Sequence, residues 1–165
     1  MSPRPFVMWP DTRLRTPAEP VAEVTDEIRA TWDDMVDTMV AMPGVGLAAP
    51  QIGVMLRLAV VDGSDAGGQA VRLANPELLW ASDEMRPHEE ASPNLPGVSA
   101  RIERPAKVRV RYLDESGAQV ERDFEGLWST SVQHQIDHLD GHVFIDRLSR
   151  VKREMILKRF RKARR

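Results

Sequence analysis

The sequence contains no cysteine, and this absence removes two structural options. A chain without cysteine forms no disulfide, and it offers no thiolate to a metal ion. The chain also has no apolar run of about eighteen residues, the length that a membrane-spanning helix requires. Its first residues are interspersed with proline and charge, unlike the apolar segment of a signal peptide. We therefore expect a cytoplasmic protein with no membrane partner.

The composition is that of an ordinary globular chain. Hydrophobic residues make up 42% and charged residues 29% of the 165 residues. This length suits one hydrophobic core, so we expect a single domain over residues 1–165.

Positive charge is concentrated at the C-terminal end. Residues 150–165 hold nine Lys or Arg and one Glu, a local charge of +8 in a chain whose net charge is −2. One interpretation is a solvated helix that packs back on the acidic body. The other is attraction to a polyanion such as ribosomal RNA, which weakens as salt rises. Val151, Met155, Ile156 and Phe160 recur at helical spacing, so one face of this segment is expected to dock; no DNA partner is expected.

Hydrophobic periodicity predicts helices at both ends of the chain and strands between them. A period of about 3.6 predicts a helix from Ala22 to Ala41, and Leu127 to Asp140 predicts a second helix, closed by Gly141. Strands are predicted at Leu56–Asp62 and Leu73–Ala81, a hairpin over 108–124, and an irregular loop over Glu89–Gly97. Because the strands cluster between the helices, the pattern favours an α+β fold over a regular βαβ array.

Two histidines stand one helical turn apart in the second predicted helix. His134 and His138 are at i and i+4, so both imidazoles lie on one face and can hold one divalent metal ion. In the common H-E-x-x-H arrangement the residue after the first His is the Glu that serves as general base. Here that position is Gln135. A histidine pair at this spacing is by itself a weak signal, and packed or surface histidines are the alternative.

A second segment places small residues before a Pro-Gln corner. It reads Gly44-Val45-Gly46-Leu47-Ala48-Ala49-Pro50-Gln51. Small residues let a ligand backbone approach closely, and the glutamine adds an amide that can point at it. The alternative is a helix-to-strand connection that happens to be filled with small residues.

These segments together resemble the peptide deformylase family. That family carries G-x-G-x-A-A-x-Q, then E-G-C-L-S followed by Pro-Gly, then Q-H-E-x-D-H. The first pattern is matched in full, and the third is matched at Gln133, His134, Asp137 and His138. Weaker likenesses occur at Pro10–Arg15, Asn75-Pro76-Glu77, Glu103-Arg104-Pro105 and Phe144-Ile145-Asp146. The resemblance covers most of the chain.

The resemblance implies a fold and an activity. The fold has mixed or antiparallel β-sheets around a central helix that bears both histidines, with an N-terminal and a C-terminal helix. The activity, part of protein biosynthesis, removes the N-formyl group from the N-terminal Met of nascent polypeptides. In the family two His and one Cys bind Fe, Zn or a similar cation, and the Glu activates the metal-bound water. The motif Gln and a backbone N–H after the Cys hold the formyl oxygen.

Carried over residue by residue, the resemblance assigns roles to seven positions. It places His134, His138 and Ser92 as metal ligands, Gln135 at the catalytic position, and Gly46, Gln51 and Pro93 at the substrate. Four of the residues in the second motif depart from the pattern. Ala91 replaces Gly, Ser92 replaces Cys, Pro93 replaces Leu and Asn94 replaces Ser, while Glu90 and Pro96-Gly97 match.

The departures affect the metal, the base and the oxyanion donor separately. Ser92 brings neither the charge nor the soft donor of a thiolate. Pro93 has no backbone N–H, and the amide of Gln135 does not titrate. We therefore expect an inactive or strongly impaired deformylase-like pseudoenzyme, with Fe, Zn or Ni bound weakly through His134 and His138, or no metal.

Two alternatives stay open. One is an active or weak metal-dependent amide hydrolase that uses Glu89 or Glu90 as its base. Glu89, Glu90 and His88 are the nearby candidates for the missing metal ligand. The other is a module that binds formyl-Met peptides, nascent chains or the ribosome, the last through the basic C-terminal segment.

Overall fold

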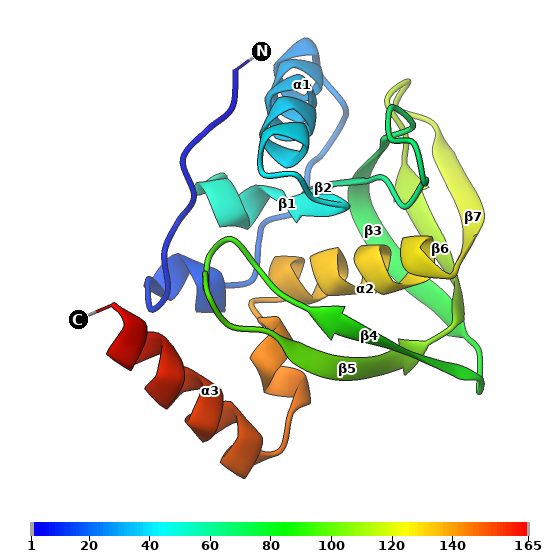
Figure 1. Ribbon diagram of the computed structural model, residues 1–165. Helices are drawn as coiled ribbons and strands as arrows, with labels where there is room; N and C mark the ends of the chain where they lie inside the picture. Colours follow the sequence, from blue (N-terminus) through cyan, green and yellow to red (C-terminus); the bar gives the residue numbers. More distant parts are fainter. Residues whose placement is uncertain (1, 165) are drawn as a thin grey trace.

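The computed structural model describes residues 2–164 and shows helices around two antiparallel sheets (Figure 1). The helices are α1 (Asp26–Ala41), α2 (Leu127–Leu139) and α3 (Arg150–Ala163), with short 3-10 turns η1 (Thr12–Arg15), η2 (Ala49–Ile52) and η3 (Phe144–Arg147). The strands are β1 (Gly46–Ala48), β2 (Leu58–Val61), β3 (Val71–Ala81), β4 (Met85–Glu90), β5 (Ala100–Pro105), β6 (Lys107–Leu113) and β7 (Gln119–Glu125). The predicted α+β class is confirmed, and every pairing between these strands is antiparallel.

Helix α2 runs through the middle of the molecule. Strands β1-β2-β3-β6-β7 form a five-stranded sheet on one side of it, and β4-β5 form a two-stranded sheet on the other (Figure 1). Ten of its side chains are buried, polar ones included. A helix this enclosed can hold polar groups only where they find partners or face a cavity. That constraint makes α2 the natural place for a functional site.

Helix α1 begins later than predicted. The expected start was Ala22, but the helix begins at Asp26 because Thr25 caps it. The side-chain oxygen of Thr25 accepts a hydrogen bond from the backbone N–H of Ile28 at 3.3 Å. This bond satisfies one of the unpaired amides at the helix start. The apolar face of α1 then packs Trp32, Met35 and Met39 against the five-stranded sheet.

The middle of the chain also differs in detail from the prediction. The predicted strand over Leu73–Ala81 contains a bulge, where Asn75 has φ 50°. Its side chain bonds both backbone groups of Val21, which stabilises that conformation. The predicted loop begins only after Glu90, because β4 continues to that residue and pairs with β5. Strands β1, β4 and β5 were not predicted.

Helix α3 docks through only part of the predicted face. Ile156, Leu157 and Phe160 are buried, but Val151 and Met155 are 70% and 55% exposed. The predicted face was therefore wrong at these two positions. In the part of the chain that the structure describes, no helix combines the length and apolar character needed to cross a membrane.

Candidate functional site

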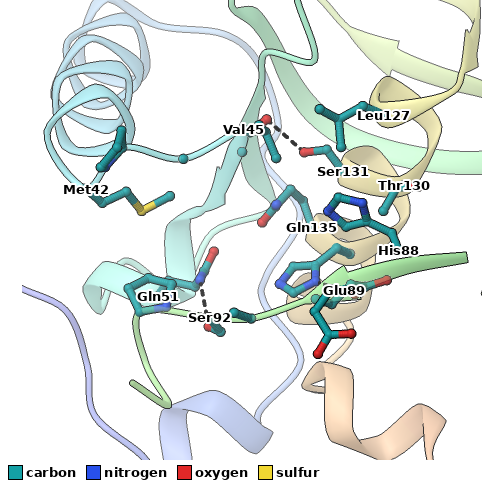
Figure 2. Close-up of a pocket in the computed structure, with 17 residues that line it drawn as sticks. Met42, Val45, Gln51, His88, Glu89, Ser92, Leu127, Thr130, Ser131 and Gln135 are labelled. Carbon is teal, nitrogen blue, oxygen red and sulfur yellow. Dashed lines mark hydrogen bonds and ion pairs between the residues drawn. The ribbon is translucent and has the colours of Figure 1, made fainter. Parts of the chain in front are cut away.

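A cavity of about 340 Å³ opens beside α2, where β4 and the segment before β1 approach it (Figure 2). Helix α2 contributes Leu127, Thr130, Ser131, His134 and Gln135. The other walls are Met42, Pro43, Gly44, Val45, Gly46 and Gln51 on one side and His88, Glu89, Glu90, Ala91, Ser92 and Pro93 on the other. The cavity thus combines apolar walls with a few polar groups, as small-ligand and peptide sites do.

The small residues before β1 allow that segment to lie directly on α2. A side chain at Gly46 would place its Cβ 2.3 Å from Ser131 Oγ and 2.5 Å from Gln135 Nε2. Ser131 Oγ also donates a hydrogen bond to the carbonyl oxygen of Val45 at 2.8 Å. Glycine is therefore required here by close packing against α2.

The two histidines lie side by side but differ in their hydrogen-bond partners. Their ring centroids are 4.9 Å apart. His134 Nδ1 donates to Glu90 Oε1 at 2.8 Å, so this bond engages Nδ1 and not Nε2. Burial lowers the pKa of His138 well below its usual value, so this ring is neutral. Within the described residues, neither ring nitrogen of His138 has a hydrogen-bond partner.

A buried ion network holds His134 in place. Arg104 donates to both oxygens of Glu90, at 2.7 and 2.9 Å, and to Asp137 at 2.9 Å. Arg147 pairs with Asp137 from the surface side. Burial acts to raise the pKa of Glu90, but its hydrogen bonds to His134 and Arg104 outweigh burial and lower the pKa to about 2. Glu90 is thus a carboxylate whose oxygens are already used, an arrangement that orients the imidazole.

The replaced residues of the second motif lie at the cavity wall. Ser92 is 5% exposed, and its hydroxyl donates to Asn94 Oδ1 at 3.0 Å. Pro93 lines the cavity and has no N–H to offer. Gln135 is 4% exposed, and among the described residues no group bonds its Oε1. The three departures therefore lie around one cavity.

The donor set fits a divalent cation only in part. Two imidazoles, one oriented by a carboxylate and one without any partner among the described residues, are of the ligand type that suits Fe, Zn or Ni. The third metal-ligand position, which is Cys in the family motif, holds Ser92. Its hydroxyl is neutral and hydrogen-bonded to Asn94. Within residues 2–164 no group of three or more His, Cys, Asp and Glu side chains could hold a metal ion.

Six of the seven residues singled out from the sequence line the cavity, whereas His138 is buried on α2 and is not among the lining residues. The network partner Arg104 is visible in the sequence only as part of the likeness Glu103-Arg104-Pro105. Its role could not be foreseen, because β5 was not predicted. In the sequence, Asn94 is visible only as a departure from the motif. Its burial and its bonds appear only in the folded chain.

Comparison with known proteins identifies the family. A polypeptide deformylase family model matches residues 3–154. Peptide deformylase of Phenylobacterium zucineum is 47% identical, covering 98% of this chain and 97% of the relative. A peptide deformylase-like protein of Bradyrhizobium diazoefficiens is also 47% identical, covering 98% and 95%. The chain belongs to the polypeptide deformylase family.

Solved deformylase structures show the same fold. The peptide deformylase of Legionella pneumophila has a TM-score of 0.91 at 38% identity, covering 99% of this chain and 96% of that one. The Ehrlichia chaffeensis peptide deformylase in complex with actinonin has a TM-score of 0.91 at 36% identity, covering 100% and 99%. The predicted deformylase-like fold is therefore confirmed.

Proposed function

We propose that this chain is a deformylase-family protein that holds the N-terminal Met end of a peptide or nascent chain but hydrolyses its formyl group poorly or not at all. The observation that carries the proposal is the convergence of Ser92, Pro93 and Gln135 on one cavity. The deformylase scaffold around them is intact, from the paired histidines to the packing of Gly46 against α2. Binding needs that scaffold, whereas hydrolysis needs the groups that have been replaced.

Each replacement removes a separate contribution to the rate. General-base catalysis typically supplies about 10²–10⁴-fold, and Gln135 cannot accept a proton at ordinary pH. One oxyanion donor supplies about 10²–10³-fold, and Pro93 has none to give. A metal held by His134 and His138 would polarise a bound carbonyl, but without a thiolate it would be held weakly. The losses act on one unit, so they are not expected to multiply fully.

The two acidic residues beside the cavity do not replace the lost base. Glu90 has a pKa of about 2 and is bonded by Arg104 and His134, so it has little tendency to take a proton. Glu89 is exposed, and its Oε1 accepts a hydrogen bond from Ser99 at 2.9 Å.

A decisive experiment restores the three residues together. Ser92→Cys, Pro93→Leu and Gln135→Glu are combined, and formyl-Met-Ala-Ser turnover is measured with Fe(II), Co(II), Ni(II) and Zn(II) supplied. We expect the triple variant to exceed the wild type by at least about 100-fold and to copurify with metal. The same variant carrying His134→Ala is the control and should lose the gain. Wild-type turnover within tenfold of the triple variant would refute the proposed impairment.

A second candidate function is a working metal-dependent deformylase. It is favoured by the relatives at 47–48% identity named peptide deformylase and by the neutral, unpartnered ring of His138. Metal content of protein purified without chelators separates the two candidates. This function would replace the first if the wild-type protein contains stoichiometric metal and turns over formyl-Met-Ala-Ser within tenfold of the triple variant.

A ribosome contact through α3 is a further part of the proposal. Its exposed cations are Arg150, Lys152, Lys158, Arg159, Arg161, Lys162 and Arg164. Because Ile156, Leu157 and Phe160 are buried, charge reversal is a cleaner test than deletion of the helix. Lys158→Glu with Lys162→Glu should abolish salt-sensitive cosedimentation with ribosomes, whereas Arg101→Glu on β5 should not. Equal cosedimentation of both variants would exclude this contact. A single domain over 1–165 and a cytoplasmic location complete the proposal.

A further inference from the structure

Asn94 is a replaced motif residue that the proposed function leaves unexplained. It is 0% exposed and lies behind the cavity wall formed by Ser92 and Pro93. A fully buried side-chain amide carries two donors and an acceptor that all need partners. Its partners therefore show what the residue does.

Asn94 closes a hydrogen-bonded triangle with two residues of the cavity. Gln51 Nε2 donates to Asn94 Oδ1 at 2.7 Å, and Ser92 Oγ donates to the same oxygen at 3.0 Å. The third side is the longer bond from Gln51 Nε2 to Ser92 Oγ, at 3.4 Å, which is drawn in Figure 2. One N–H of Gln51 Nε2 thus donates to Asn94, and the other makes only the longer bond to Ser92 Oγ, whose own hydrogen is donated to Asn94.

Both amides in the triangle are prevented from rotating. Asn94 Nδ2 donates to the carbonyl oxygens of Val7 at 2.6 Å and Gln51 at 3.0 Å. Gln51 Oε1 accepts from the backbone N–H of Ala48 at 2.8 Å. With these bonds in place, Gln51 cannot turn its Nε2 toward the cavity without breaking at least one short bond.

The side chain of Asn94 presents the same C=O group as a formamide. We propose that Asn94 is a built-in carbonyl that occupies the amide of Gln51, so that the cavity selects a peptide by its Met side chain and backbone and is indifferent to the N-formyl group. This inference rests on the proposed peptide binding. A formyl oxygen that bonded Gln51 would take an N–H from Asn94 Oδ1 or from Ser92 Oγ. Either exchange replaces one neutral hydrogen bond by another, and such an exchange yields little net free energy.

Wild-type protein provides the first test. Two probes, formyl-Met-Ala-Ser amide and its analogue 4-(methylthio)butanoyl-Ala-Ser amide without the formamide, are titrated by calorimetry in the presence of a chelator. The dissociation constants are expected to agree within twofold. Formylated peptide bound fivefold or more tightly would overturn the inference, because about fivefold is the effect of one net hydrogen bond. Absence of binding by both probes would refute peptide binding itself, which separates the two proposals.

Asn94→Ala tests the triangle directly. Freed from Asn94, Gln51 should favour the formylated probe by about fivefold. Val98→Ala is the control, since it truncates a buried side chain of the neighbouring core without touching the triangle. An unchanged probe ratio in Asn94→Ala would overturn the inference.

Hydrogen exchange tests the triangle without any peptide. Exchange of the Gln51 side-chain amide, followed by NMR, should be at least tenfold faster in Asn94→Ala than in Val98→Ala. Equal rates in two folded variants would overturn the inference. If Asn94→Ala does not fold, the ratio of the two dissociation constants measured on wild-type protein is the test of the inference.

Discussion

Removal of Arg104 should destabilise the protein far more than removal of any surface arginine. Arg104 is 1% exposed and neutralises Glu90 and Asp137, which are 4% and 7% exposed. Arg104→Met keeps most of the side-chain length but leaves two buried carboxylates with reduced compensation. Breaking a buried pair in this way costs about 3–5 kcal/mol.

The pKa of Glu90 supports a similar magnitude. In the folded chain it lies at about 2, against an ordinary value of 4.5. A displacement of this size corresponds to about 3 kcal/mol of stabilisation of the charged form, which His134 and Arg104 provide together. Typical domains have about 5–15 kcal/mol of stability, so the variant should lose a large share of it.

The pH dependence gives the prediction a second, independent readout. Because the pKa of Glu90 is lowered on folding, its contribution is present above about 4.5 and is lost as pH falls through 2. In Arg104→Met burial acts with less opposition, which raises the pKa of the carboxyl groups. Protonation then stabilises the variant as pH falls from 7 to 5, and the difference from wild type should shrink.

Urea denaturation at pH 7 and pH 5 measures both effects. Arg111→Met is the matched control, because Arg111 and its partner Glu77 have side chains 37% and 61% exposed. Such a pair is worth at most about 1 kcal/mol. A loss at pH 7 no larger than that of the control, or a loss that stays constant down to pH 5, would refute the account of the network.

Two further predictions concern the histidines and the cap of α1. His134→Leu should destabilise metal-free protein by about 1–3 kcal/mol because it takes a hydrogen bond from Glu90, whereas His138→Leu, which removes only unpartnered nitrogens, should be neutral or stabilising in thermal unfolding. The reverse order would contradict the assignment of partners. Thr25→Ala should cost about 1 kcal/mol through loss of the cap, and Thr31→Ala, within the same helix, should cost less than half of that by urea titration. Equal losses would show that the cap contributes nothing.

Local patterns in the sequence were sufficient to predict the helices and the hairpin. The 3.6-residue period of α1 and α2 and the alternation of β6 and β7 depend on neighbours in the chain, so they are visible without a fold. The bounds were less certain, because the start of α1 depends on one cap and the bulge in β3 depends on Asn75 bonding to distant Val21. Strands β4 and β5 were missed, since each is stabilised mainly by pairing with the other.

The sequence by itself determined which chemical groups are missing from the three motif positions. Absence of cysteine, Gln135 beside His134, and a proline at position 93 can be read without coordinates, because an amide does not titrate and proline has no N–H in any fold. Only the tertiary structure decided how the remaining polar groups are used. Arg104 donates to both oxygens of Glu90, and Asn94 accepts a hydrogen bond from the amide of Gln51 across 43 positions of the chain. Such pairings depend on which strands and loops come together in three dimensions, and spacing along the chain does not encode that.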